Sequence, residues 1–115
     1  GLKAVLDRLH AWNPDLPKHI TENGMASSDG IRTGDGSIDD TDRIDYLARH
    51  IAVVDDARAA GVDVRTYTAW SLLDNFEWAR GLSQTFGLVE VDRRTQDRLP
   101  KASFTWLRDE IARRR

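Results

Sequence analysis

One glutamate stands out because of the residues around it. Residues 20–24 read I-T-E-N-G, which places Glu22 between a β-branched pair and an Asn-Gly turn. Parallel α/β folds carry their reacting groups at the carboxyl ends of strands, and Glu22 occupies such a position if residues 19–22 form a strand. A Glu before Asn-Gly is also a common solvated turn residue. This motif alone therefore leaves both interpretations open.

A second segment, residues 70–78 (W-S-L-L-D-N-F-E-W), also begins where a predicted strand ends. It holds two tryptophans, a phenylalanine and two acids. Such groups suit a sugar, because its apolar ring faces stack on aromatic rings while its hydroxyls bond to carboxylates and amides. The alternative is a packed aromatic core in which Asp74 or Asn75 caps a turn. Two such segments at successive strand ends favour the sugar site.

The elements that position these segments follow from hydrophobic spacing. Apolar residues at helical steps predict a helix over 2–12 that Asn13-Pro14 ends, and a second over 42–60 that Gly61 ends. Residues 62–70 are β-branched and aromatic enough for a buried strand. The other expected segments are a strand over 19–22, a loop over 25–42, an irregular stretch over 71–85, a strand over 86–91, a turn-rich connection over 92–99, and a helix over 100–111 with Pro100 in its first turn.

This order alternates helix and strand, as parallel βα units do. Two parallel strands cannot form a covered sheet alone, so the sequence predicts part of a larger α/β domain. Gly1 leads into a helical pattern without an N-cap residue, as expected of a fragment or processed product. In such a part we expect the strand faces at Val64, Thr66 and Thr68, and the flanking helices, to be exposed.

Composition narrows the class further. The 115 residues, 40% hydrophobic and 31% charged, suit one soluble domain, and a net charge of -2 favours neither nucleic acid nor anionic membrane as a partner. The absence of cysteine excludes disulfides and thiolate metal sites. Apolar runs fall far short of the roughly 20 residues of a membrane span. We expect a cytoplasmic protein.

No metal site or cofactor is predicted. His10, His19 and His50 show no ligand spacing, so surface or packing roles are expected. Residues 39–42 (D-D-T-D) suit the N-terminus of a helix better than calcium, which needs more ligands and a sharp glycine turn. The arginines at 113–115 end a helix where positive charge suits the dipole.

Three motifs in order make a resemblance specific: residues 17–24 (P-K-H-I-T-E-N-G), 70–79 (W-S-L-L-D-N-F-E-W-A) and 86–92 (F-G-L-V-E-V-D). They resemble the C-terminal signature of glycoside hydrolase family 1, the retaining β-glucosidases, and the likeness covers nearly the whole chain. It implies a (β/α)₈ TIM barrel, of which residues 1–115 supply the seventh and eighth strands with flanking helices.

The resemblance also implies roles for individual residues. Glu22 would be the catalytic nucleophile that forms the covalent glycosyl-enzyme. Trp70 would lie under the sugar ring, Glu77 would accept hydrogen bonds from the 4- and 6-hydroxyls, and Trp78 would donate one to the 3-hydroxyl. The substrate would be a β-glucoside or oligosaccharide with a terminal β-glucosyl or related residue. Glu77 argues against the 6-phosphoglycosidase branch, because a carboxylate repels phosphate.

The chain also departs from the family pattern. Residues 81–87 (G-L-S-Q-T-F-G) replace the common Gly-Tyr-x-Lys-Arg-Phe-Gly, and the N-E-P motif of the acid/base is absent. Neither Glu77 nor Asp74 is expected to replace that acid. The isolated chain is therefore expected to be inactive without the remaining N-terminal barrel segment. The alternative is a degenerate sugar-binding or interaction module without catalysis, which would dimerise to cover its strand edges.

Overall fold

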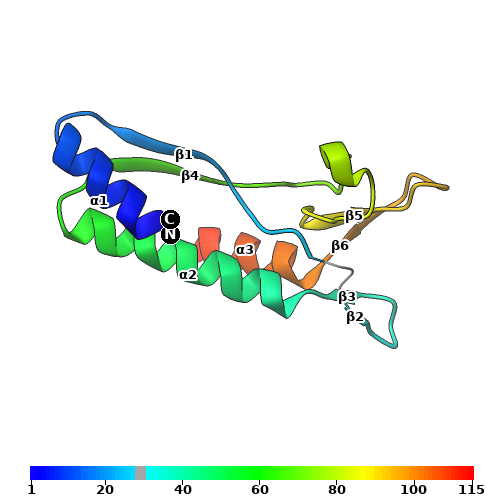
Figure 1. Ribbon diagram of the computed structural model, residues 1–115. Coiled ribbons are helices and arrows are strands. Elements are labelled where there is room, and N and C mark those ends of the chain that lie inside the picture. Colours follow the sequence, from blue (N-terminus) through cyan, green and yellow to red (C-terminus); the bar gives the residue numbers. More distant parts are fainter. Residues whose placement is uncertain (28–30) are drawn as a thin grey trace. The chain divides into compact units, whose positions relative to one another are not determined.

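The computed structural model describes residues 1–27 and 31–115 (Figure 1). The chain divides into two compact units. The first unit comprises residues 1–23 and 47–69, and the second comprises residues 24–46 and 70–115. The elements in chain order are α1 (Leu2–Trp12), β1 (Lys18–Asn23), β2 (Ile31–Arg32), β3 (Ile38–Asp39), α2 (Thr41–Ala59), β4 (Val64–Ala69), the 3₁₀ helix η1 (Trp78–Arg80), β5 (Val89–Val91), β6 (Arg98–Pro100) and α3 (Ala102–Arg113).

In the first unit, β1 and β4 pair in parallel, as the sequence predicts. His19 lies opposite Thr66, and Asn23 lies opposite Ala69 at the carboxyl ends of both strands (Figure 1). Among the described residues this sheet contains only these two strands. The connection between them runs through α2, which is the crossover that a parallel pair requires.

The core of the first unit is a small apolar cluster to which both helices and β4 contribute. Val64 of β4 is only 3% exposed, so the expectation that its face would be open is wrong. Val64 is buried because it lies at the start of β4, where it packs in the apolar cluster, whereas Thr66 and Thr68, further along the same face of the strand, are exposed as expected. The cluster consists of Leu6, Val54, Ala57, Val62 and Val64.

The predicted end of α1 is confirmed, and polar contacts explain it. The Asn13 Oδ1 atom accepts hydrogen bonds from the backbone N–H groups of Asp15 and Leu16, both at 3.2 Å. The buried Lys18 ammonium donates to the Asn13 carbonyl at 2.9 Å. The Asn13 side chain thus satisfies two N–H groups of the turn after the helix, Lys18 satisfies the carbonyl of the C-cap residue, and Pro14 prevents a further turn.

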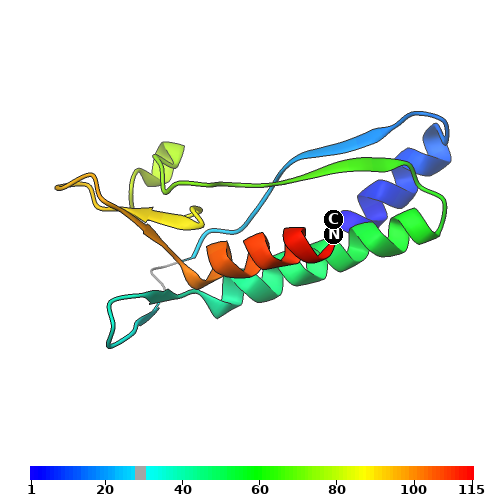
Figure 2. The same ribbon diagram turned by 180° about the vertical axis from the view of Figure 1, so that it is seen from behind.

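In the second unit, the predicted strand over 86–91 is present as the shorter β5, and the predicted turn-rich connection over 92–99 leads into β6, so residues 89–100 form a hairpin that was not predicted. β5 and β6 are antiparallel, with Val89 opposite Pro100, and the chain continues from β6 into α3 (Figure 2). Pro100 therefore lies in a strand, which corrects the prediction that it opens the final helix. The Lys101 N–H donates to the Leu88 carbonyl at 2.9 Å, which holds this residue outside the helix. α3 consequently begins at Ala102.

The expected long loop over 25–42 contains a second hairpin, formed by β2 and β3. Its turn is closed by a 2.9 Å bond from the Thr33 N–H to the Ser37 carbonyl. The Thr33 hydroxyl and the Ser37 N–H and hydroxyl lower the pKa of Asp35 in this turn to about 2. Arg32 of β2 reaches Glu90 of β5 with two 2.7 Å contacts, so this hairpin is tied to β5.

The acids before α2 do bind its first turn, but only one acts as a simple cap. The Asp39 Oδ1 atom accepts from the Thr41 N–H at 3.1 Å, as expected. Asp40 is buried and instead accepts from the N–H of Ser103 at 2.8 Å and from its hydroxyl at 2.6 Å. The carboxylate of Asp40 thus joins the start of α2 to the start of α3.

A buried ion pair supports residues 70–78 of the second unit, which are called the aromatic segment below. Lys101 and Asp74 are each 4% exposed, and the Nζ to Oδ1 distance is 2.9 Å. The same oxygen accepts the Gly87 N–H at 2.8 Å. Paired and hydrogen-bonded, the carboxylate is stable in the interior, where an isolated one is strongly disfavoured.

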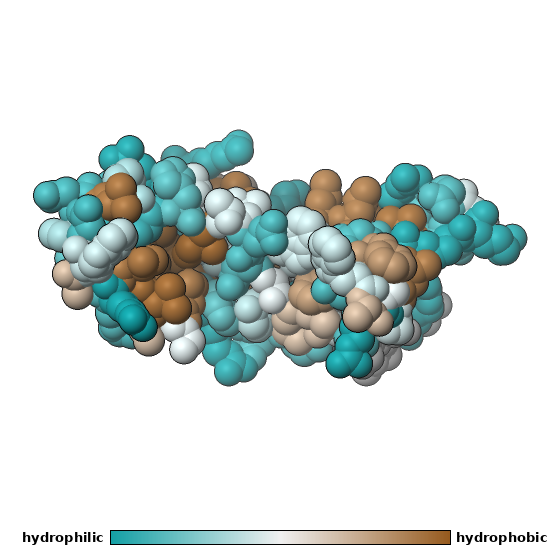
Figure 3. Space-filling model, turned by 45° about the horizontal axis from the view of Figure 1, so that its top comes forward, coloured by the Kyte–Doolittle hydropathy of each residue, from teal (hydrophilic) through white to brown (hydrophobic). Residues whose placement is uncertain are grey.

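Many apolar side chains remain exposed among hydrophilic ones (Figure 3). None of the helices in residues 1–27 and 31–115 is long and apolar enough to cross a membrane. The large exposed apolar residues are Val5, Leu9, Trp12, Leu16, Trp70, Leu72, Leu73, Phe76, Trp78, Leu82 and Ile111.

Truncation of the first unit's core is expected to destabilise the chain. Leu6→Ala should lower the free energy of unfolding by about 2–5 kcal/mol, because Leu6 is 2% exposed at the centre of the cluster. Leu9→Ala on the same helix is the matched control, since Leu9 is 40% exposed and should cost about 1 kcal/mol or less. Urea unfolding followed by far-ultraviolet circular dichroism measures both, and equal losses would show that the cluster is not the core.

The buried ion pair of the second unit gives a separate prediction. Lys101→Met leaves the Asp74 carboxylate buried without its cation and should cost about 3–5 kcal/mol. Lys3→Met is the control, because Lys3 pairs with Asp7 on the surface of α1 and such pairs contribute about 0.5 kcal/mol or less. Tryptophan fluorescence during urea unfolding reports the loss, and an unchanged midpoint for Lys101→Met would contradict it.

Candidate active site

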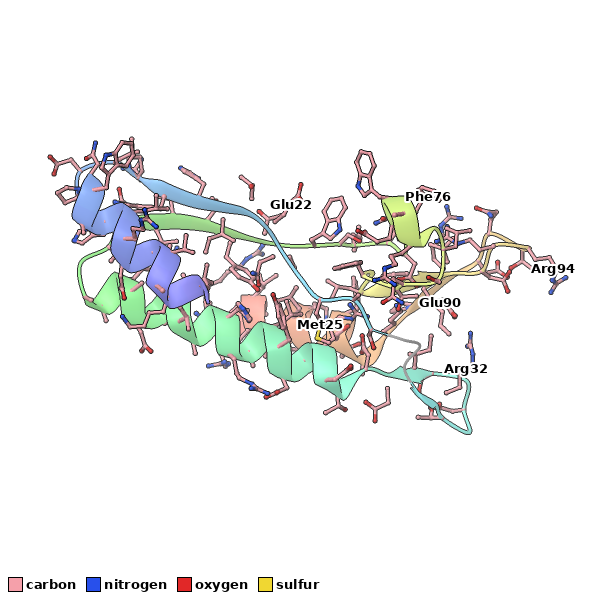
Figure 4. The ribbon with its side chains drawn as sticks, viewed as in Figure 1. Glu22, Met25, Arg32, Phe76, Glu90 and Arg94 are labelled. Atoms are coloured by element: carbon pink, nitrogen blue, oxygen red, sulfur yellow. The ribbon has the colours of Figure 1, made fainter. Side chains whose placement is uncertain are left out.

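Glu22 is the penultimate residue of β1, at the carboxyl end that the sequence predicts (Figure 4). Its side chain is exposed and forms no hydrogen bond with the described residues. The next residue, Asn23, accepts a 2.7 Å hydrogen bond from the Tyr67 hydroxyl of β4. Sequence reasoning missed Tyr67, although a half-buried phenol in a strand needs a polar partner. The Tyr67 bond fixes the strand end directly after Glu22.

Gly24 brings the segment after Glu22 against the start of the aromatic segment. A Cβ atom at position 24 would lie 1.8 Å from the Trp70 carbonyl oxygen, so only glycine fits there. Trp70 itself is 40% exposed. Glu22 is thus two residues before Gly24, whose backbone contacts Trp70 directly. Asn23, which follows Glu22, is paired with Ala69, which precedes Trp70.

Backbone hydrogen bonds anchor the aromatic segment to residues 86–89. The Ser71 N–H donates to the Phe86 carbonyl at 3.1 Å, and the Leu88 N–H donates back to the Ser71 carbonyl at 2.9 Å. The Asp74 N–H donates to the Val89 carbonyl at 3.0 Å. Sequence reasoning predicted the two segments as separate, and their motifs prove to be one structural unit.

The turn-capping interpretation holds for Asp74 and Asn75. Asp74 is buried against Lys101 and Gly87, and a Cβ atom at Gly87 would lie 2.2 Å from the Asp74 nitrogen. The Asn75 amide donates to the Ser71 hydroxyl at 2.9 Å and to the Leu73 carbonyl at 3.1 Å. These polar groups are therefore used within the loop and shape it.

Glu77 and Trp78 lie beyond that support, where η1 begins. The Glu77 N–H donates to the Gly81 carbonyl at 2.7 Å, and the Gly81 N–H donates to the Trp78 carbonyl at 3.1 Å. Trp78 adopts a φ of 39°, a left-handed conformation that is uncommon for an aromatic residue. Its side chain is 85% exposed. Backbone outliers of this kind cluster at ligand-binding sites.

The second unit therefore presents several groups suited to a sugar on one loop. Phe76, beside η1, is also exposed (Figure 4), and the half-buried Glu77 carboxylate forms no hydrogen bond with the described residues. Trp70, Glu77 and Trp78 share this loop, whereas Glu22 belongs to the first unit and is linked to the loop through Asn23 and Gly24. In the part of the chain that the structure describes, no cluster of His, Asp and Glu is arranged to hold a metal ion.

Comparison with known proteins identifies the family to which the chain is similar. Residues 1–115 match the family described as Glycosyl hydrolase family 1. A bifunctional β-D-glucosidase/β-D-fucosidase of Bifidobacterium breve is 51% identical over 115 residues, which cover 97% of this chain and 25% of that protein. A 6-phospho-β-galactosidase of Streptococcus equi subsp. zooepidemicus is 44% identical over 107 residues, 92% of this chain and 22% of that protein.

The fold agrees with the sequence comparison. A β-glucosidase from Thermotoga maritima in complex with deoxynojirimycin superposes with a TM-score of 0.92 and 41% identity, over 97% of this chain and 26% of that one. The chain thus spans about a quarter of the length of these relatives and is an α/β segment that matches part of family 1 barrel structures. By sequence and by fold, the chain belongs to glycoside hydrolase family 1.

Proposed function

We propose that the chain is the nucleophile-bearing C-terminal part of a retaining β-glycosidase. In this proposal β1 and β4 are the seventh and eighth strands of the barrel, and residues 1–115 are its last βα units. The parallel pair supports this assignment, because consecutive strands of a barrel are hydrogen-bonded neighbours joined by a helix. The observation that carries the proposal is Glu22 at the carboxyl end of β1, two residues before a glycine packed on Trp70.

Glu22 would act as the nucleophile. Its carboxylate attacks the anomeric carbon, the bond from that carbon to the leaving oxygen breaks, and a covalent glycosyl-enzyme forms. Water then displaces Glu22 and gives a sugar with retained configuration. The exposed position of Glu22 suits this role, because the carboxylate is not committed to another group among the described residues.

The leaving oxygen also needs a proton, which this chain does not supply. A retaining enzyme places its acid/base carboxyl about 5 Å from the nucleophile. Among the acids of the aromatic segment, Asp74 is paired with the buried Lys101 and is not available as an acid. Glu77 is half-buried, lies beyond the turn that Asp74 supports, and is assigned below to the binding of the sugar. We therefore assign the acid/base to the remaining N-terminal barrel segment, and expect the isolated chain to be inactive. No cofactor or metal takes part in this mechanism.

Trp70, Glu77 and Trp78 would bind the glycone. The exposed Trp70 ring offers an apolar face for the sugar ring, and the free Glu77 carboxylate accepts hydrogen bonds from the 4- and 6-hydroxyls. The left-handed backbone of Trp78 holds its indole outward, where its N–H donates to the 3-hydroxyl. The substrate is then a β-glucoside or oligosaccharide.

A second candidate function is a sugar-binding module without catalysis. The exposed Phe76 and Trp78 beside an uncommitted carboxylate favour it, since these groups bind a sugar without any reaction. The two functions differ in what the complete protein does. The binding module would bind a glycoside and leave it intact.

The first test is release of nitrophenol from an aryl β-glucoside. Two full-length barrels serve: the protein obtained when the reading frame extends upstream, and the Thermotoga maritima enzyme with its matching quarter replaced by this chain. We expect both to be active and the 115-residue chain alone to be inactive. Glu22→Gln should lower kcat by more than about 10³-fold, because the nucleophile is lost.

Glu90→Gln is the control for that experiment, since it neutralises a carboxylate of β5 that pairs with Arg32. It should retain most of the activity. Activity of the isolated chain that disappears in Glu22→Gln would place the acid/base within these 115 residues. A full-length barrel that binds the glucoside without cleaving it would establish the binding module instead.

The charge of Glu77 gives a prediction about phosphate. An aryl β-glucoside should be cleaved about a hundredfold or more better than its 6-phosphate, because two like charges about 4 Å apart repel by several kcal/mol. Glu77→Gln should narrow this ratio, while Glu90→Gln leaves it unchanged. Comparing kcat/KM for the two substrates measures the effect. Faster cleavage of the phosphate by the unmodified barrel would assign it to the activity that the streptococcal relative is named for.

A further inference from the structure

Arg43 is a fully buried cation in the second unit, and the mechanism above does not use it. Its side chain is 2% exposed on the first turn of α2. The guanidinium donates to three groups: Nε to Asp40 Oδ2 at 2.9 Å, Nη1 to the Met25 carbonyl at 2.7 Å, and Nη2 to the Thr85 carbonyl at 3.1 Å. A buried charge is tolerated only with such partners, so losing any of these three bonds would destabilise the fold around Arg43.

The two carbonyls belong to segments that meet at an isolated antiparallel bridge between Ser27 and Thr85. The Ser27 N–H donates to the Thr85 carbonyl at 3.0 Å, and the Thr85 N–H donates to the Ser27 carbonyl at 3.3 Å. The Thr85 hydroxyl adds a 2.8 Å bond to the same Ser27 carbonyl. Arg43 thus holds both sides of this bridge, one bond to each side.

Each side of the bridge leads to one part of the proposed site. Met25 follows Glu22 by three residues, and the intervening Gly24 packs on the Trp70 carbonyl. Thr85 precedes Phe86, whose carbonyl accepts the Ser71 N–H at the base of the aromatic segment. The guanidinium therefore joins the exit of the nucleophile strand to the base of the sugar-binding loop.

Arg43 is itself fixed from a third direction. Asp40 neutralises its charge, and both oxygens of that carboxylate are held by the Ser103 N–H and hydroxyl at the start of α3. The planar guanidinium presents its donors in a rigid fork, so fixing Nε also fixes where Nη1 and Nη2 point. The positions of the Met25 and Thr85 carbonyls are set in this way by the two helix starts.

We propose that Arg43 is a positioning residue for the glycosidase reaction. It touches no substrate. Within the second unit it holds Met25, three residues after Glu22 in the chain, and Thr85, at the base of the sugar-binding loop, so that this loop keeps the conformation in which it would present the sugar for reaction. The inference rests on the proposed function. A displacement of about 1 Å at a reacting group lowers the rate by about a hundredfold.

The test measures kcat and KM of a full-length barrel for an aryl β-glucoside, with two variants at Arg43 and one at Thr85. Arg43→Met keeps the length of the side chain and removes all its hydrogen bonds, and should lower kcat by about 10- to 100-fold while KM changes much less. Arg43→Lys restores a charge and some bonds and should recover part of kcat. Thr85→Val removes only the bond from the hydroxyl to Ser27, and should give a smaller loss in the same direction.

Leu47→Ala is the matched control, because Leu47 lies one turn further along α2, is fully buried and has an apolar side chain that forms no hydrogen bond. Leu47→Ala should lower the melting temperature at least as much as Arg43→Met and leave kcat unchanged well below that temperature. This separates positioning from stability.

The outcomes are distinct. An active barrel in which Arg43→Met loses kcat, Arg43→Lys regains part of it and Leu47→Ala retains it supports the inference. An active barrel in which Arg43→Met and Thr85→Val keep the normal kcat overturns the inference alone. If Arg43→Met does not fold, Arg43→Lys and Thr85→Val decide in the same way. An inactive unmodified barrel removes the proposed function, and the positioning role with it.

Discussion

The parallel pairing of β1 and β4 is the constraint on which the rest of the structure depends. Parallel strands direct their carboxyl ends to the same edge of a sheet, so whatever follows Asn23 and Ala69 must leave from that edge. The residues at these exits are Glu22 on one strand and Trp70 after the other. The crossover helix α2 is a consequence of the same geometry, because a parallel connection has to return along the sheet.

The two units are stabilised in different ways. The first depends on an apolar cluster, with Leu6 and Val64 at its centre. The second depends on two buried ion pairs, Lys101 with Asp74 and Arg43 with Asp40. The first pair joins residues 27 positions apart, and the second reaches distant segments through further hydrogen bonds to Met25, Thr85 and Ser103. Apolar contacts tolerate small shifts, whereas hydrogen bonds from a buried charge demand defined directions. The directional contacts are found where the chain departs from regular helix and strand.

Much of the regular structure was predictable from the sequence, and much of the irregular structure was not. The periodic apolar residues of α1 and α2 and the β-branched run of β4 identify those elements, since each is long enough to show its period. β2, β3 and β6 have two or three residues each and show none. Pro100 was misassigned because proline suits both a first helical turn and an edge strand.

The candidate site shows the same division. Glu22, Trp70, Glu77 and Trp78 were predicted because their motifs are contiguous in the sequence, and their roles remain proposals. Arg43 was not predicted, because its partners Met25 and Thr85 lie 18 and 42 positions away and no local pattern relates them. Tyr67 escaped notice for the same reason, since its partner Asn23 is 44 positions away.

The contact between Gly24 and the Trp70 carbonyl bears on how this region can change. The two backbones touch without an intervening side chain, so neither segment can move toward the other unless the other also moves. A laboratory selection that reshapes the sugar platform through the backbone at Trp70 would also displace the chain that leads from Glu22. Sugar preference is therefore more easily altered by substituting Glu77 and Trp78, because these residues belong to a turn that is closed by its own hydrogen bonds.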